Sequence, residues 1–129
     1  MKAEQAIMKE IMIEFMASDC DDEWNYVLTD ENIYEAYEDF SEKDLHWDGE
    51  DEFRCSGEVT SIRNDGSRHF EADSVAKKLS SGQWVGWVYY YGGGKHSEPS
   101  AMDWMDDAYF LEVEEKKVTI TKREFTKID

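Results

Sequence analysis

The residues with the clearest chemical potential are carboxylates, and most of them gather in one segment. Residues 19–52 carry 15 Asp or Glu and a single base, Lys43, which gives a net charge of −14 in 34 residues. Residues 54–129 are almost balanced, with 13 acids and 11 bases. Carboxylates at this density can bind cations, work as acid–base pairs, or contact Lys and Arg side chains of another protein. Their spacing decides among these uses.

The spacing does not support a metal site, and no cofactor is expected. In a calcium loop starting at Asp44, position three would be His46 and position twelve would be Cys55, where a bidentate Glu is required. The three histidines lack the spacing of a zinc site. The run GGGKHS at 92–97 lacks the first Gly of a phosphate loop and has His96 where Ser or Thr should follow the Lys.

No catalytic signature stands out, so the chain is not expected to be an enzyme. A small hydrolase built on the His96 region is a third, weaker alternative. Its acid–base groups would come from His96 and nearby carboxylates, namely Glu98, Asp103, Asp106 and Asp107.

The acids instead follow helical spacing, which favours a binding surface. Glu31, Glu35, Glu38 and Glu42 recur on one stripe of a helix predicted over residues 30–43. Like charges four residues apart cost about 0.2–0.5 kcal/mol per pair, and a single Lys would relieve that cost. Aromatic side chains within the segment are typical anchors of protein interfaces. The predicted partner-binding residues are Asp21, Asp22, Glu23, Trp24, Glu31, Glu35, Glu38, Asp39, Glu42, Trp47, Asp48, Glu50, Asp51 and Glu52.

The elements that would position these residues predict an α+β fold. Residues 3–17 read as an amphipathic helix with a Met-rich apolar stripe, for which core packing is the expected use. We expect these N-terminal acidic helices to pack on an antiparallel sheet of four or five strands. The chain is expected to be a single domain over 1–129, helical and acidic over 1–52 and mainly β over 53–129.

The second half carries the strand patterns. A strand pattern starts at Phe53, and Asn64-Asp65-Gly66-Ser67 predicts a hairpin turn before the next strand. Residues 84–91, WVGWVYYY, are bulky on both faces and predict a central strand. A short helix is predicted over 98–107 with Ser97 as its cap. A second hairpin is predicted from 108–113 and 117–125, turning at 114–117.

Composition excludes several function classes. A net charge of −17 makes direct binding to nucleic acid or to an anionic membrane unfavourable. No apolar run is long enough for a membrane span, and no secretory signal is recognisable, so a cytoplasmic location is expected. Two cysteines, Cys20 and Cys55, make no disulfide framework and are interpreted as reduced thiols, although the sequence leaves their pairing open.

In size, charge and segregation of charge, the chain resembles the small acidic phage-encoded inhibitors of bacterial defence, the anti-CRISPR and anti-restriction DNA mimics. This resemblance covers residues 19–52 and involves no residue motif. It implies a non-catalytic protein that blocks the DNA- or RNA-binding channel of a basic partner, such as a CRISPR effector, a restriction protein or a nucleoid protein. The alternative is an α+β interaction module of a phage or bacterial regulatory system, with an acidic face that is only solvated.

Overall fold

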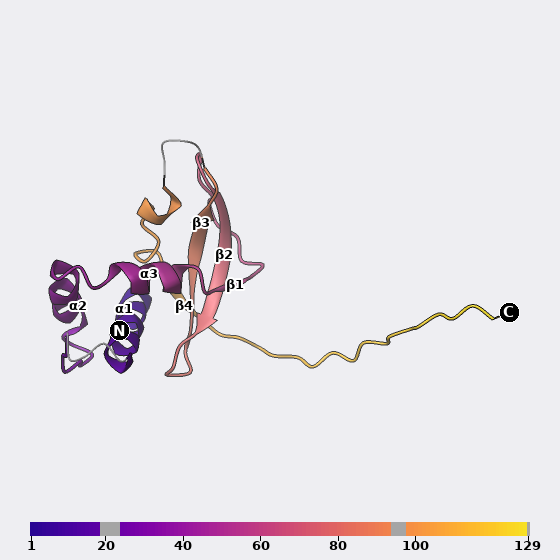
Figure 1. Ribbon diagram of the computed structural model, residues 1–129, viewed down its shortest axis with the longest axis horizontal. Helices are drawn as coiled ribbons and strands as arrows, with labels where there is room; N and C mark the ends of the chain where they lie inside the picture. The colour runs from indigo at the N-terminus through magenta and orange to yellow at the C-terminus, as the bar shows by residue number, and fades with distance from the viewer. Residues whose placement is uncertain (19–23, 94–97, 129) are drawn as a thin grey trace.

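The computed structural model describes residues 1–18, 24–93 and 98–128. It has an α+β fold, as predicted, with three α-helices on one side and a four-stranded antiparallel sheet on the other (Figure 1). Helix α3 crosses between α2 and the sheet, so it joins the two parts of the molecule (Figure 1).

Helix α1 spans Ala3–Ala17, as the apolar periodicity predicted. Its stripe is buried: Ile7, Ile11 and Met12 are almost fully inaccessible to solvent. Met8 and Met16 pack against the same core as partly buried side chains. The Met-rich face of α1 therefore builds the core.

Helix α2 spans Ile33–Glu42 and starts later than the predicted 30–43. The reason is the turn before it, where Asn32 Oδ1 accepts a 2.8 Å hydrogen bond from the Thr29 N–H and Asn32 Nδ2 donates to the Val27 carbonyl. Asp44 adopts a left-handed conformation at φ 56° just past the end of the helix. The Leu45 N–H then donates to the Phe40 carbonyl, which closes the last turn and redirects the chain into α3.

Helix α3 spans Trp47–Arg54, so the prediction that strand structure begins at Phe53 is wrong. Phe53 is buried, and its ring lies 5.0 Å from the ring of Trp87 and 6.1 Å from that of Trp104. These three rings form the aromatic cluster that joins α3 to the sheet. Tertiary packing on this cluster outweighs the local β preference of the sequence.

The sheet has the order β1-β2-β3-β4, with every neighbouring pair antiparallel. Its strands are Glu58–Val59, Glu71–Lys78, Trp84–Tyr91 and Tyr109–Leu111. The pairing of the first predicted hairpin is confirmed, because β1 pairs with β2. The connection is longer than the predicted turn at 64–67, since it spans residues 60–70, and Gly66 takes a positive φ of 69° within it. The prediction that 84–91 is an interior strand is also confirmed, because β3 lies between β2 and β4.

Two predictions about the last third of the chain are wrong. The predicted helix over 98–107 is reduced to a single 3₁₀ turn at Pro99–Ala101, and its predicted cap, Ser97, lies outside the described residues. The second hairpin does not form, because residues 112–128 contain no strand and run away from the sheet (Figure 1). β4 is therefore an edge strand with three residues.

Helix α1 is fixed to both neighbouring layers. Towards the sheet, the buried carboxylate of Glu10 accepts hydrogen bonds from the Ser80 backbone N–H and hydroxyl, the latter at 2.9 Å. Towards α3, the helices approach closely at Gly49, where an added Cβ would stand 2.8 Å from Ile11 Cγ2. Glycine is required there because any side chain would collide with α1.

Candidate protein-binding surface

Helix α2 presents an outward row of carboxylates because most of its apolar residues turn inward, Tyr34 being the exception at 44% exposed. Ile33, Ala36, Tyr37 and Phe40 are buried. The opposite face carries three exposed side chains, Glu35, Glu38 and Glu42. Among the residues that the structure describes, none of these three carboxylates takes part in an ion pair. They are free to meet cationic groups from outside.

Helix α3 extends the acidic surface toward the sheet. Asp48 and Glu52 are exposed, and neither forms an ion pair within the described residues. Glu50 is half-buried and accepts a 2.5 Å hydrogen bond from the Tyr37 hydroxyl, which ties α3 to α2. Burial, followed by this bond to a negative group, raises the pKa of Tyr37, so the phenol stays protonated and donates.

Two of the predicted residues are used inside the molecule. Trp24 is 6% exposed and stacks on Tyr26 at 5.5 Å, so it belongs to the core and presents no anchor at the surface. Its indole N–H donates to Asp39 Oδ2 at 2.9 Å, and Lys43 Nζ lies 2.8 Å from the same oxygen. The bonds from Lys43 and then Trp24 lower the pKa of Asp39. Asp39 therefore positions the segment before α2, with its charge balanced by Lys43.

The charge density along α2 approaches that of a nucleic acid strand. Ten residues rise about 15 Å at ~1.5 Å per residue, and besides Asp39, which is paired with Lys43, they carry three acids, Glu35, Glu38 and Glu42. That is about one outward negative charge per 5 Å, against one per ~3.4 Å along a single DNA strand. A protein groove that recognises phosphates would meet carboxylates at a comparable interval here.

A pocket of about 690 Å³ lies at the sheet end of this surface. Carboxylates and aromatic rings line it together, and the Trp47 side chain at its edge is 62% exposed. Aromatic faces and carboxylates both attract ammonium and guanidinium groups. The lining residues are Trp47, Asp48, Glu50, Asp51, Arg54, Tyr89, Tyr90, Tyr91, Gly92, Glu98, Pro99, Ser100 and Trp104.

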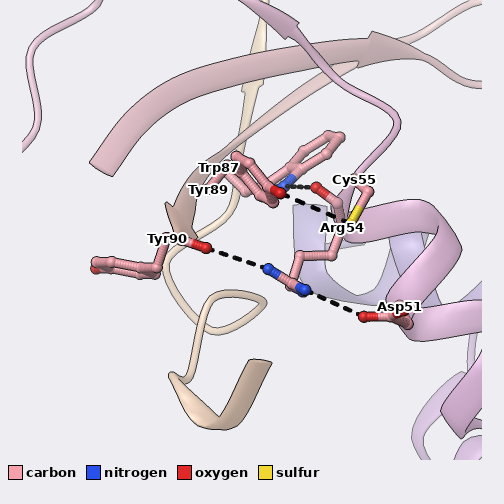
Figure 2. Close-up of polar contacts among 6 residues, drawn as sticks. All are labelled: Asp51, Arg54, Cys55, Trp87, Tyr89 and Tyr90. Carbon is pink, nitrogen blue, oxygen red and sulfur yellow. Dashed lines mark hydrogen bonds and ion pairs between the residues drawn. The ribbon is translucent and has the colours of Figure 1, made fainter. Parts of the chain in front are cut away.

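Arg54 is one of the residues that line this pocket, and its contacts join α3 to β3 (Figure 2). Its guanidinium donates to the Tyr90 carbonyl at 3.2 Å and to Asp51 Oδ1 at 3.1 Å, and it lies 5.2 Å from the centre of the Tyr89 ring. The Arg54 carbonyl accepts a 3.2 Å bond from the Trp87 indole N–H. The charge of Asp51 is thus balanced internally, while Asp48 and Glu50 remain as the negative side of the pocket.

The structure places most of the predicted residues at exposed or half-buried positions on or beside α2 and α3, and leaves a few elsewhere. Glu31 is exposed just before α2, and Trp47 is exposed at the start of α3. Asp21, Asp22 and Glu23 lie outside the described residues. Sequence reasoning missed Arg54 and the tyrosines of β3, because only the pairing of α3 with the sheet places them beside Trp47. The run 84–91 was predicted as a central strand, and of its aromatic side chains Trp87 alone is fully buried.

The structure describes only some of the residues predicted for the hydrolase alternative. His96 lies outside the described residues, and Asp103 and Asp106 lie together, since partial burial and then Asp106 raise the pKa of Asp103. Among the described residues, no three His, Cys, Asp or Glu side chains are grouped so as to hold a metal ion. Cys55 is an exposed free thiol whose sulfur lies 3.9 Å from the Tyr89 hydroxyl (Figure 2). Cys20 lies outside the described residues.

Comparison with known proteins gives no match: neither a family model, nor a curated protein, nor a solved structure corresponds to this chain. None of the helices among the described residues combines the length and hydropathy that a membrane span requires.

Proposed function

We propose that this protein is a non-catalytic inhibitor that presents carboxylates in place of phosphates and occupies the DNA- or RNA-binding channel of a basic partner. A CRISPR effector, a restriction protein or a nucleoid protein is the class of target that such a surface fits. The observation that carries the proposal is the outward row of Glu35, Glu38 and Glu42, which form no ion pair within the described part of the chain, on a helix whose other face is buried.

The arrangement of charge supports this proposal over a surface that is only solvated. Solvated acidic surfaces of stable domains usually intersperse bases that relieve repulsion, and α2 has Lys43 alone at its end, already bound to Asp39. The repulsion between Glu38 and Glu42 is therefore left in place, and a cationic partner relieves it on binding. Such a partner would also be steered toward the surface, so that its association slows as salt increases.

The pocket beside Trp47 supplies an anchor for the same partner. An Arg or Lys side chain of a phosphate-binding channel would enter between the aromatic rings and the carboxylates of Asp48 and Glu50. The pocket would add recognition by shape to the electrostatic attraction of α2. A partner would then recognise a particular set of groups, and not acidity alone.

The experiment is capture of partners on the immobilised protein from nuclease-treated bacterial lysate at low and high salt, with identification by mass spectrometry. Three forms are compared: wild type, a triple variant Glu35→Gln, Glu38→Gln, Glu42→Gln, and a control with Glu58→Gln, Asp65→Asn, Glu71→Gln. Both variants lose three negative charges from exposed positions, but the control changes only the sheet half. We expect the α2 variant to lose affinity about tenfold or more and the control to bind as wild type.

The identity of the captured protein and its competition with nucleic acid decide the outcome. A nucleic-acid-binding protein that salt releases and added duplex DNA displaces supports mimicry. A partner that both variants bind equally, and that duplex DNA leaves in place, would contradict it and favour the α+β interaction module with a merely solvated acidic face.

A further inference from the structure

The segment 116–128, which we name the C-terminal arm, exposes apolar side chains that a stable chain normally covers. Val118, Ile120, Phe125 and Ile128 are between 77% and 92% exposed. The arm leaves the sheet after β4 and runs away from the rest of the molecule (Figure 1). Four large apolar side chains in eleven residues, all in solvent, indicate a segment whose partner surface lies outside its own chain.

The composition of the arm is that of a β-strand. The run Val118-Thr119-Ile120-Thr121 is entirely β-branched, and it alternates apolar and polar side chains. The arm contains neither Pro, which would remove a ladder hydrogen bond, nor Gly, which would weaken a strand. An extended segment of this kind satisfies its backbone groups by joining the edge of a sheet.

A receiving edge is present at the point where the arm leaves the sheet. β4 is the last strand in the sheet order, so its outer side pairs with no strand of the described chain. Beside it lies a hollow of about 900 Å³ that includes Trp84, Phe110, Leu111 and Val113. Phe110 and Val113 are 40% and 42% exposed, which leaves apolar surface for an added strand to cover.

Charge favours a second copy of this chain as the occupant. The arm holds five bases, Lys116, Lys117, Lys122, Arg123 and Lys127, against Glu124, which gives a net charge of +4. The rest of the chain has a net charge of −21. A basic arm is therefore drawn to the acidic body of another copy, and Glu112 and Glu115 stand beside the hollow itself.

We infer that the protein forms a two-fold symmetric dimer in which each arm adds as a strand to β4 of the other copy. The thirteen residues of the arm span about 43 Å when extended at ~3.3 Å per residue, so the arm reaches a neighbouring sheet without strain. An exchange of identical arms is reciprocal, since each copy both supplies a strand and offers an edge. Val118 and Ile120 cover the hollow at Phe110 in this arrangement.

The test measures mass by light scattering after size exclusion and amide hydrogen exchange of the arm, each over a range of protein concentrations. Wild type is compared with Val118→Ser, Ile120→Ser and with the matched control Thr119→Ser, Thr121→Ser. We expect wild type to have the mass of two 15.1 kDa chains and to protect amides 117–125 only where the dimer is populated. The first variant should raise the dimer dissociation constant about tenfold or more, and the control should leave it within about twofold.

Three results would overturn the inference. A monomer whose arm amides are unprotected at every concentration shows that the arm has no partner among copies of this chain. A monomer with protected arm amides shows a hairpin within one chain. A dimer that the Val118 and Ile120 substitutions leave unchanged shows an interface elsewhere. None of these results bears on the acidic surface of α2, which is tested separately by capture and competition.

Discussion

The helical part of the molecule and the sheet part use charge in opposite ways. Residues 1–53 hold 18 acids and 3 bases, while residues 54–129 hold 13 acids and 11 bases. In the helices most carboxylates face outward over an apolar core, with Glu10 as a buried exception, and few have a basic neighbour among the described residues. In the sheet the charges are balanced and aromatic side chains supply the packing. The imbalance therefore belongs to one layer of the fold, and the fold itself does not require it.

The two parts are nevertheless packed against each other by apolar and polar contacts. Phe53 of α3 inserts beside Trp87 and Trp104. Glu10 of α1 accepts hydrogen bonds from Ser80 in the turn between β2 and β3. If the two layers form one cooperative unit, then a change at the aromatic cluster unfolds both, whereas a change in surface charge leaves both folded.

The largest effect is expected from Phe53→Ala, which breaks the contact between the layers. Removing a fully buried Phe costs about 3–5 kcal/mol of unfolding free energy. Denaturant unfolding followed by far-ultraviolet circular dichroism and by Trp fluorescence measures the loss in both layers. Trp47→Ala, an exposed aromatic on the same helix, is the control and should stay within about 0.5 kcal/mol of wild type. Separate transitions in the two signals would contradict a single cooperative unit.

A smaller loss is expected from Arg54→Met, which keeps the aliphatic part of the side chain but removes the guanidinium. The Tyr90 carbonyl and the Asp51 carboxylate lose their donor, which costs about 1–3 kcal/mol. The same denaturant titration checks this value, with the exposed Arg63→Met as control. Equal stability of the two variants would mean that the guanidinium contacts of Arg54 add nothing measurable to the stability of the fold.

Removing the charges of Glu35, Glu38 and Glu42 should raise the stability of the fold, whereas the two preceding substitutions lower it. In Glu35→Gln, Glu38→Gln, Glu42→Gln, two like-charge pairs are removed, so the unfolding free energy should rise, by no more than about 1 kcal/mol. Thermal unfolding at low and at high salt measures it, and the gain should shrink at high salt because ions screen the repulsion. A clear destabilisation would show that these carboxylates support the fold, and would weaken the distinction between the layers.

The smallest effect is a pH dependence at Asp39. Its pKa in the folded protein lies below the usual 3.8, so the unfolded chain binds more protons than the folded one in that range. The stability from Asp39 is thus complete above about pH 3.8 and is lost as the pH falls through the lower folded value. Asp39→Asn should flatten the curve of unfolding free energy against pH below 3.8, measured against wild type. If wild type and Asp39→Asn have the same slope below pH 3.8, then Asp39 does not contribute to the pH dependence of stability.

Local sequence predicts α1, α2 and the interior strand well, because each of them carries its own periodicity, whereas α3 was not predicted. The apolar stripe through Ile7 and Ile11 marks α1, and the bulky run from Trp84 marks β3. The errors lie where a distant contact decides the structure. The local sequence predicts that a strand starts at Phe53, but Phe53 lies in α3 and packs against Trp87 and Trp104. Val118 and Ile120 read as a hairpin strand, although their own chain does not turn back to pair with them.

The candidate surface was predictable to the extent that it follows one helix. The outward direction of Glu35, Glu38 and Glu42 comes from helical spacing alone. The pocket does not, because it joins Trp47 of α3 to Tyr90 of β3, and no local pattern relates residues so far apart. The prediction for Trp24 was wrong in the opposite way. Its position among acidic residues predicts a surface anchor, but in the structure it stacks on Tyr26 in the core.

The absence of a side chain at Gly49 has a consequence for association thermodynamics. Because α3 sits directly on Ile11 at that point, and is bonded to α2 through Glu50 and Tyr37, its backbone is ordered before any partner arrives. Binding then spends little conformational entropy on arranging the carboxylates. An acidic peptide of the same composition would have to order itself on contact and would bind more weakly at equal charge. Under the proposed function, Gly49 would thereby contribute to affinity without a contact to the partner.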